Sequence, residues 1–371
     1  MPLPSPPGDF YAVPDPLPPG DPGSIIWAEP VAAPEGARAW RVLYHSRTVR
    51  DADIAVSGLV VAPDGPPPVG GYPVLAYAHG TTGLADRCAP STSARPLADG
   101  GGASGELPIP PLWTSGYVIA ATDYEGLGTP GRHPYLVGAS EARSMLDAVR
   151  AARSIDEAAA GDRSVAIGVS QGGHAALFTG ELAAPYAPDA GLIGVVALAP
   201  AAELAQAALL LTGDESVVGL AVAIGAGFAA AHPEAEVERI LTPSALERLD
   251  IVDTGCIDDI TAAFAGPVAE VLRFEALVEP PWATLLAENT PGRTRTPVPV
   301  FVGQGDADAL VVPELTDALV VRLCAIGDDV TYRRYLGASH ESVVEAAGDD
   351  VLSWAFDRFA GRPTGSTGCP D

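Results

Sequence analysis

Residues 168–172 read Gly-Val-Ser-Gln-Gly, and the sequence on either side of them determines the expected fold. The preceding residues 164–169 form an apolar run typical of a buried strand, and residues 171–184 are typical of a helix that stops at Pro185. A serine between a strand and a helix occupies a sharp turn, in which the flanking glycines prevent a steric clash. We therefore interpret Ser170 as a nucleophile exposed at the end of a strand.

Outward from this turn, apolar strands and helices alternate along the chain. The expected strands cover residues 40–49, 54–62, 73–78, 116–122, 164–169, 192–198, 298–302 and 330–336. The expected helices cover residues 139–160, 171–184, 314–325 and 342–359. Such an alternation favours an α/β fold in which helices flank a mostly parallel sheet.

The alternation is interrupted once, which predicts an inserted helical lid or cap. Residues 200–291 are rich in alanine. Several short segments within them have a helical pattern, and none has the pattern of a strand. The core is then divided into residues 39–199 and 292–371. Residues 1–38 are interpreted as a proline-rich N-terminal arm, because the first 22 residues include nine prolines. Regular structure is expected to begin near Ala39.

The composition excludes several classes of function. The 371 residues include 47 acidic and 21 basic side chains, and the net charge of −26 disfavours binding to nucleic acid. All of the basic residues are arginine, so a phosphate-loop lysine or a Schiff-base lysine is excluded. The longest uncharged apolar run, residues 217–231, is too short to span a bilayer, and we expect no transmembrane anchor. No secretory signal is visible at the N-terminus.

A serine in this kind of turn requires an acid and then a histidine later in the chain. The acid is expected in the loop that follows the strand at residues 298–302, where Asp308 is our preferred candidate and Asp306 the alternative. Among the six histidines, only His340 follows that loop. His340 is therefore interpreted as the base that accepts the proton of Ser170.

Backbone N–H groups near the serine are expected to bind the developing oxyanion. Gln171 follows the nucleophile and supplies the first group, and the loop at residues 79–83 supplies the second through Thr81 or Thr82. His174 lies one helical turn after Ser170, and we interpret it as a packing residue rather than a catalytic one.

No cofactor or metal is expected. Residues 126–131 match a dinucleotide-binding pattern, but prolines disfavour the helix that the pattern requires. The segment at His340 lacks the second histidine of a zinc-protease motif. The four cysteines include no Cys-x-x-Cys pair. Either Cys369 in the C-terminal tail forms a disulfide, which indicates an oxidising compartment, or all four cysteines are free thiols.

Several of these segments together resemble the secretory lipase family of α/β-hydrolases. The resemblance covers roughly residues 20–360 and is carried by residues 79–83, 88–91, 123–128, 133–136, 168–174 and 304–308 and by His340. It implies the α/β-hydrolase fold, a helical lid before the acid, and a catalytic triad of Ser170, Asp308 and His340.

The resemblance also implies an exported protein with disulfides Cys88–Cys256 and Cys324–Cys369. The expected activity is that of a serine hydrolase that cleaves carboxylic esters, either as a lipase acting on triacylglycerol at a lipid–water interface or as a broad carboxylesterase. The alternatives are a short-chain esterase, a polyester esterase, an amidase, or a non-catalytic protein that binds an apolar ligand. The oligomeric state is not predicted.

Overall fold

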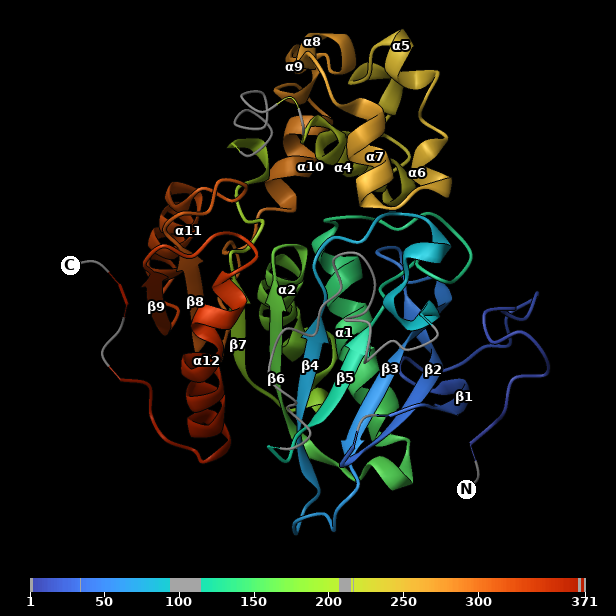
Figure 1. Cartoon of the computed structure of the whole chain (residues 1–371), viewed down its shortest axis with the longest axis vertical. Helices are drawn as coiled ribbons and strands as arrows, with labels where there is room; N and C mark the ends of the chain where they lie inside the picture. Colours follow the sequence, from blue (N-terminus) through green and yellow to red (C-terminus); the bar gives the residue numbers. More distant parts are fainter. Residues whose placement is uncertain are drawn as a thin grey trace.

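The computed structural model describes residues 3–33, 35–93, 115–206, 215, 217–365, 368 and 369. Over these residues, one sheet of nine strands forms the centre of the molecule (Figure 1). Its strands are β1 (Ile25–Val31), β2 (Ala37–Arg47), β3 (Asp53–Pro63), β4 (Tyr72–Ala78), β5 (Val118–Thr122), β6 (Ala160–Val169), β7 (Leu192–Leu198), β8 (Val300–Gly305) and β9 (Val330–Tyr335). The order across the sheet is β1-β2-β3-β5-β4-β6-β7-β8-β9.

The sheet is antiparallel at one edge and parallel elsewhere. Strands β1, β2, β3 and β5 pair in antiparallel fashion, and all pairs from β5 through β4 to β9 are parallel. Parallel strands bring their carboxyl ends to one edge, which is where functional loops gather in such sheets. The expected α/β-hydrolase fold is confirmed.

The sequence-based expectation that regular structure begins near Ala39 is wrong, because β1 already pairs with β2 from Ile25. β1 is an edge strand, and an edge strand tolerates Pro30 since its other side needs no backbone donor. The interpretation of residues 1–38 as a proline-rich arm therefore missed β1, an edge strand of the sheet.

Helices cover both faces of the sheet (Figure 1). Alternate residues of β4 point to opposite faces, so Val74 packs in one hydrophobic cluster and Leu75 in another. The first cluster includes α1 (Gly138–Arg153), α2 (Gln171–Tyr186) and α11 (Pro313–Ala325), and the second includes α12 (Val343–Phe359). Helix α1 ends at Arg153, earlier than the expected residue 160, because the backbone becomes extended at Ile155 and then forms a 3-10 turn before β6.

Between β7 and β8 the described residues form only helices. They are α4 (Val218–Ala231), α5 (Pro243–Leu246), α6 (Ile251–Thr254), α7 (Ile257–Phe264), α8 (Val268–Val271), α9 (Phe274–Leu277) and α10 (Trp282–Glu288), with a short 3-10 turn at Val237–Arg239. They gather at one end of the sheet as a cap (Figure 1) and share a hydrophobic cluster with Leu84 and Tyr135 of the core.

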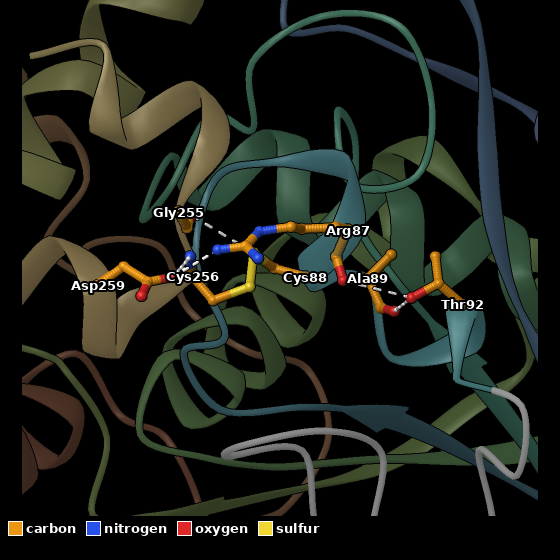
Figure 2. Close-up of a disulfide and its surroundings, with 7 residues drawn as sticks. All are labelled: Arg87, Cys88, Ala89, Thr92, Gly255, Cys256 and Asp259. Atoms are coloured by element: carbon orange, nitrogen blue, oxygen red, sulfur yellow. Dashed lines mark hydrogen bonds and ion pairs between the residues drawn. A yellow bond between two sulfur atoms is a disulfide. The ribbon is translucent and has the colours of Figure 1, made fainter.

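A disulfide joins the cap to the core. Cys88, in a 3-10 turn after β4, is bonded to Cys256 at the start of α7 (Figure 2). Beside it, Arg87 of the core forms an exposed ion pair with Asp259 of α7. A second disulfide, Cys324–Cys369, ties the C-terminal tail to α11. The structure thus contains both cysteine pairs that the family resemblance implied.

Candidate active site

Ser170 lies in the strained turn that its sequence predicts. It connects β6 directly to α2, and its φ of 58° and ψ of −118° are unfavourable for a residue with a side chain. A Cβ atom on Gly168 would come within 2.2 Å of the Gly172 carbonyl oxygen, and one on Gly172 within 2.0 Å of the Ala78 carbonyl oxygen. Both positions therefore require glycine, and the turn presents the half-buried Ser170 at the carboxyl end of β6.

Asp308 and His340 meet at the neighbouring strand ends. His340 follows β9, and its Nδ1 lies 2.8 Å from Oδ2 of Asp308, whose side chain is fully buried. The other carboxylate oxygen of Asp308 accepts hydrogen bonds of 2.9 Å from the backbone N–H groups of Leu310 and Val311. Gln304 at the end of β8 donates a further bond to Oδ2, at 3.2 Å. These donors hold the carboxylate in one orientation toward the imidazole ring.

The alternative acid, Asp306, has a different environment. Its carboxylate accepts a hydrogen bond from the backbone N–H of Gly337 in an exposed turn, and His340 bonds to Asp308 instead. The geometry therefore favours Asp308 as the partner of His340.

Among the described residues, no hydrogen bond joins His340 to Ser170. The bond between nucleophile and base is often long in an enzyme without substrate and tightens when substrate binds. The two residues follow β9 and β6, whose carboxyl ends lie at the same edge of the parallel sheet.

Gln171 and the loop after β4 lie beside the strained turn at Ser170. Gln171 begins α2, so its backbone N–H has no acceptor within the helix and is available to an oxyanion. The loop after β4 also lies close to this turn, since a Cβ on Gly172 would meet the carbonyl oxygens of Ala78 and His79.

The two threonines of this loop differ in their contacts. The hydroxyl of Thr81 is hydrogen-bonded to that of Tyr135, at 2.8 Å. Thr82 is buried, and its carbonyl accepts a 2.9 Å hydrogen bond from the backbone N–H of Ile257 in the cap. The Thr82 hydroxyl has no hydrogen-bond partner among the described residues. The expected oxyanion loop is therefore in direct contact with the cap.

A buried carboxylate supports the core beneath the same loop. Asp123 follows β5 and accepts hydrogen bonds from Ser57 at 2.6 Å and from the backbone N–H and hydroxyl of Ser91. Burial raises the pKa of Asp123 even though these donors oppose the shift. The neighbouring Tyr124 donates a 2.9 Å hydrogen bond to the carbonyl of His79, which fixes the start of the loop at residues 79–83.

His174 is fully buried, in agreement with its expected packing role, but it is also part of a polar cluster that sequence analysis missed. The cluster includes Glu141 on α1 and His133 in the loop before α1, and it surrounds the side chain of Gln171. The sequence did contain one indication of this cluster. Glu141 lies four residues before Met145 and therefore on the same, apolar face of the helix. A carboxylate on a buried face requires partners.

The described residues contain no cluster of metal-ligating side chains, and none of their helices has both the length and the apolar character to span a bilayer.

The comparisons with known proteins agree with this fold. The chain matches the secretory lipase family model over residues 104–367 and belongs to this family. The nine-stranded, mostly parallel sheet is thus that of a secretory lipase-type α/β-hydrolase.

Relatives in this family differ in their named activities. A protein named probable inactive lipase from Mycobacterium tuberculosis is 26% identical over 345 residues, which cover 89% of this chain and 75% of the relative. Lipase A of Moesziomyces aphidis is 25% identical, covering 91% of this chain and 77% of the relative. A trichothecene C-3 esterase from Fusarium sporotrichioides is 26% identical, covering 67% of this chain and 58% of the relative.

Solved structures show the same fold. Candida antarctica lipase A in its closed state superposes with a TM-score of 0.82 at 21% identity, covering 94% of this chain and 85% of that structure. The rice cell wall degrading esterase LipA from Xanthomonas oryzae superposes with a TM-score of 0.75 at 19% identity, covering 93% of this chain and all of that one.

Proposed function

We propose that this protein is a serine hydrolase of carboxylic esters. Ser170 is the nucleophile, His340 the general base and acid, and Asp308 the group that orients His340 and stabilises its protonated form. The observation that carries the proposal is the strained turn at Ser170 in a secretory lipase chain whose Asp308–His340 pair forms a 2.8 Å hydrogen bond.

The proposed reaction has two stages. His340 accepts the proton of the Ser170 hydroxyl while its oxygen attacks the ester carbonyl, and the tetrahedral intermediate then expels the alcohol, which takes that proton from His340. In the second stage His340 takes a proton from a water molecule, whose oxygen attacks the acyl-enzyme; the bond to Ser170 then breaks, the carboxylic acid leaves and His340 returns the proton to the Ser170 oxygen. The backbone N–H of Gln171 and one from Thr81 or Thr82 stabilise the oxyanion in both stages.

We infer that the substrate is a lipid ester or another ester with an apolar acyl group. The cap, residues 200–291, supports this inference, since its α4 is apolar throughout and its base contacts the oxyanion loop at Thr82. The lipases and the trichothecene esterase among the relatives also support a carboxylic ester as the bond that is cleaved.

We further propose that the protein acts outside the cytoplasm. Two disulfides join segments that are 168 and 45 residues apart in sequence, and such bonds persist in oxidising compartments. Membership of the secretory lipase family supports the same location.

The alternative is a non-catalytic protein that binds an apolar ligand, and one observation favours it: a relative at 26% identity is named a probable inactive lipase. The presence in this chain of serine, acid and histidine in the required order argues for catalysis.

The proposal is tested with p-nitrophenyl butyrate and p-nitrophenyl palmitate. We expect wild-type protein to hydrolyse at least the butyrate ester, and Ser170→Ala to lower kcat by about 10⁵–10⁶-fold. Ser154→Ala, which alters an exposed serine at the end of α1, is the matched control and should keep full activity.

Chain-length preference follows from the same assay. Hydrolysis of both esters indicates a lipase-like acyl site, and hydrolysis of the butyrate alone indicates a short-chain esterase. Activity that persists in a folded Ser170→Ala protein would refute the assignment of the nucleophile.

A further inference from the structure

A buried polar cluster lies directly behind the nucleophilic turn. Four of its side chains are at most 1% exposed: His133, Glu141, Gln171 and His174. They come from the loop before α1, from α1 itself and from the first turn of α2. Asn289, the residue that ends cap helix α10, completes the cluster. The cluster therefore brings the two core helices and the end of the cap together beneath Ser170.

The orientation of the Gln171 amide follows from its neighbours. Nδ1 of His133 lies 2.8 Å from the carbonyl of Glu125, which only accepts, so Nδ1 carries the proton. Burial lowers the pKa of His133 to about 4, so its ring is neutral and its Nε2 accepts a hydrogen bond. Gln171 Nε2 donates that bond at 2.8 Å and donates its second proton to Oε1 of Glu141 at 2.9 Å. Both amide protons are thus in use.

His174 faces an oxygen acceptor on each side. Its Nε2 lies 2.9 Å from the backbone carbonyl of Asn289, and its Nδ1 lies 2.7 Å from Oε2 of Glu141. The carbonyl cannot donate, so Nε2 carries a proton. Oε1 of Glu141 already accepts from Gln171 and from the backbone N–H of Leu136, at 3.1 Å, so Oε1 itself carries no proton. An ionised Glu141 requires a proton on Nδ1 as well, which makes His174 an imidazolium.

We propose that the His174–Glu141 pair is a buried imidazolium–carboxylate pair that positions Gln171 for catalysis; this inference rests on the proposed ester hydrolysis. Neither residue touches substrate, so both are positioning residues. They act on Gln171, whose backbone N–H is the proposed oxyanion donor immediately after Ser170.

Two further hydrogen bonds connect this cluster to the turn at Ser170 and to the cap. The backbone N–H of His174 donates a 3.1 Å hydrogen bond to the carbonyl of Ser170, so the charged ring and the strained turn share one helical turn. The side-chain carbonyl of Asn289 accepts a 2.9 Å hydrogen bond from the backbone N–H of Gly138 at the start of α1. The segment that leaves the cap is thereby fixed against the same cluster.

A role in stability alone is a poor explanation for such a pair. Removing two charges from water is costly, and well-packed apolar residues often stabilise a core at least as well as a buried ion pair. Oxyanion donors, in contrast, act only if they are aligned before the transition state forms. The pair is therefore expected to affect turnover more than substrate binding.

The kinetic test compares Glu141→Gln, His174→Gln and Gln171→Met with wild type. Active sites are first titrated with a serine-directed phosphonate, so that kcat refers to each competent site. We expect kcat per site to fall by about 10–100-fold and KM to change less than about 2-fold, since a misaligned oxyanion donor weakens transition-state binding.

The matched control is Glu181→Gln, which neutralises another partly buried carboxylate farther along α2. Glu181 accepts a 2.6 Å hydrogen bond from the backbone N–H of Gly292, and within the described part of the chain no hydrogen bond joins it to the cluster. The kcat per site of Glu181→Gln should remain within about 2-fold of the wild-type value. If Glu141→Gln or His174→Gln does not fold, Gln171→Met, which keeps the charged pair, provides the kinetic result.

The charge of His174 is measured separately by ¹⁵N NMR of the imidazole ring in the wild-type protein. The ring signal of His174 is assigned as the one that is lost in His174→Gln. The groups that face the ring are Glu141 from α1, the Asn289 carbonyl from the end of α10, and the Phe178 ring of α2, with His133 beyond Gln171. We expect both ring nitrogens to carry protons at pH 8.

The outcomes separate this inference from the proposed function. Wild-type protein without serine-dependent turnover would overturn the proposed function and, with it, the catalytic role of the pair. Active wild type, combined with variants whose kcat per site equals that of Glu181→Gln, would overturn the positioning role alone. A His174 ring with only one protonated nitrogen would overturn the charged pair.

Discussion

At the scale of single residues, the acid of the proposed triad can be tested against its alternative. Asp308 is buried and bonded to His340, whereas Asp306 bonds to a backbone N–H in an exposed turn. Asp308→Asn should lower kcat by about 10³–10⁴-fold, because the amide favours the wrong tautomer of the histidine.

Asp306→Asn is the matched control for this change and should retain activity within about 3-fold of wild type. Steady-state hydrolysis of p-nitrophenyl butyrate distinguishes the two variants. A larger loss in Asp306→Asn than in Asp308→Asn would contradict the assignment.

A second residue links burial to the pH dependence of stability. Asp328, between α11 and β9, is buried, and burial raises its pKa from 3.8 to about 6. Because its folded-state pKa exceeds the unfolded value, the protein loses stability as pH rises from about 4 through 6. One carboxylate oxygen accepts a 2.9 Å hydrogen bond from the backbone N–H of Thr296, which an asparagine preserves.

Asp328→Asn should therefore raise Tm by about 2–4 °C at pH 8 and leave it nearly unchanged at pH 4. Thermal unfolding followed by circular dichroism at the two pH values measures the difference. An equal change in Tm at both pH values would show that the charge of Asp328 is not responsible.

At the scale of elements, the two disulfides should contribute differently. Cys88–Cys256 closes a segment of 168 residues and Cys324–Cys369 one of 45 residues. The loss of loop-closure entropy in the unfolded chain then corresponds to about 5 and about 4 kcal/mol. Only the first also joins the cap to the loop that contains Thr82 and Gly83.

We expect Cys88→Ala/Cys256→Ala to lower the free energy of unfolding more than Cys324→Ala/Cys369→Ala and to reduce esterase activity as well. Guanidinium denaturation and the p-nitrophenyl ester assay on both double variants measure these effects. Equal activity in the two variants would show that the cap–core link has no effect on the site.

The elements themselves were largely predictable from the sequence. The strand–helix alternation predicted the parallel part of the sheet, because each buried strand reads as an apolar run. β1 was missed because Pro30 conflicts with a central strand but not with an edge strand. The expected helix to residue 160 ends at Arg153, and the apolar pattern did not reveal the extended Ile155 or the 3-10 turn that follows it.

The site was predictable where chain order and local geometry define it. Ser170 follows from the glycines around it, and His340 from its place after the acid loop. The sequence favoured Asp308 over Asp306, but the two residues share one loop, and only the fold shows that Asp308 is the one bonded to His340. The cluster of His133, Glu141 and His174 also needed the fold, since its members come from separate elements and meet only through tertiary packing.

At the scale of the whole molecule, the sheet, the cap and the Cys88–Cys256 disulfide meet near the strand ends around Ser170. The sheet holds the serine and the Asp308–His340 pair at one edge, and Ile257 of the cap contacts the loop that is proposed to bind the oxyanion. The net charge of −26 favours solubility at neutral pH and has no bearing on which ester is cleaved.

The central claim, that Ser170 is an activated nucleophile, is tested most directly by covalent labelling. The folded protein is incubated with a fluorescent serine-directed phosphonate, and the modified peptide is located by mass spectrometry. We predict one label per chain, on Ser170, with no label in Ser170→Ala and about 10³-fold slower labelling in His340→Ala. Folded wild-type protein that remains unlabelled, or that carries the label on another serine, would contradict the account.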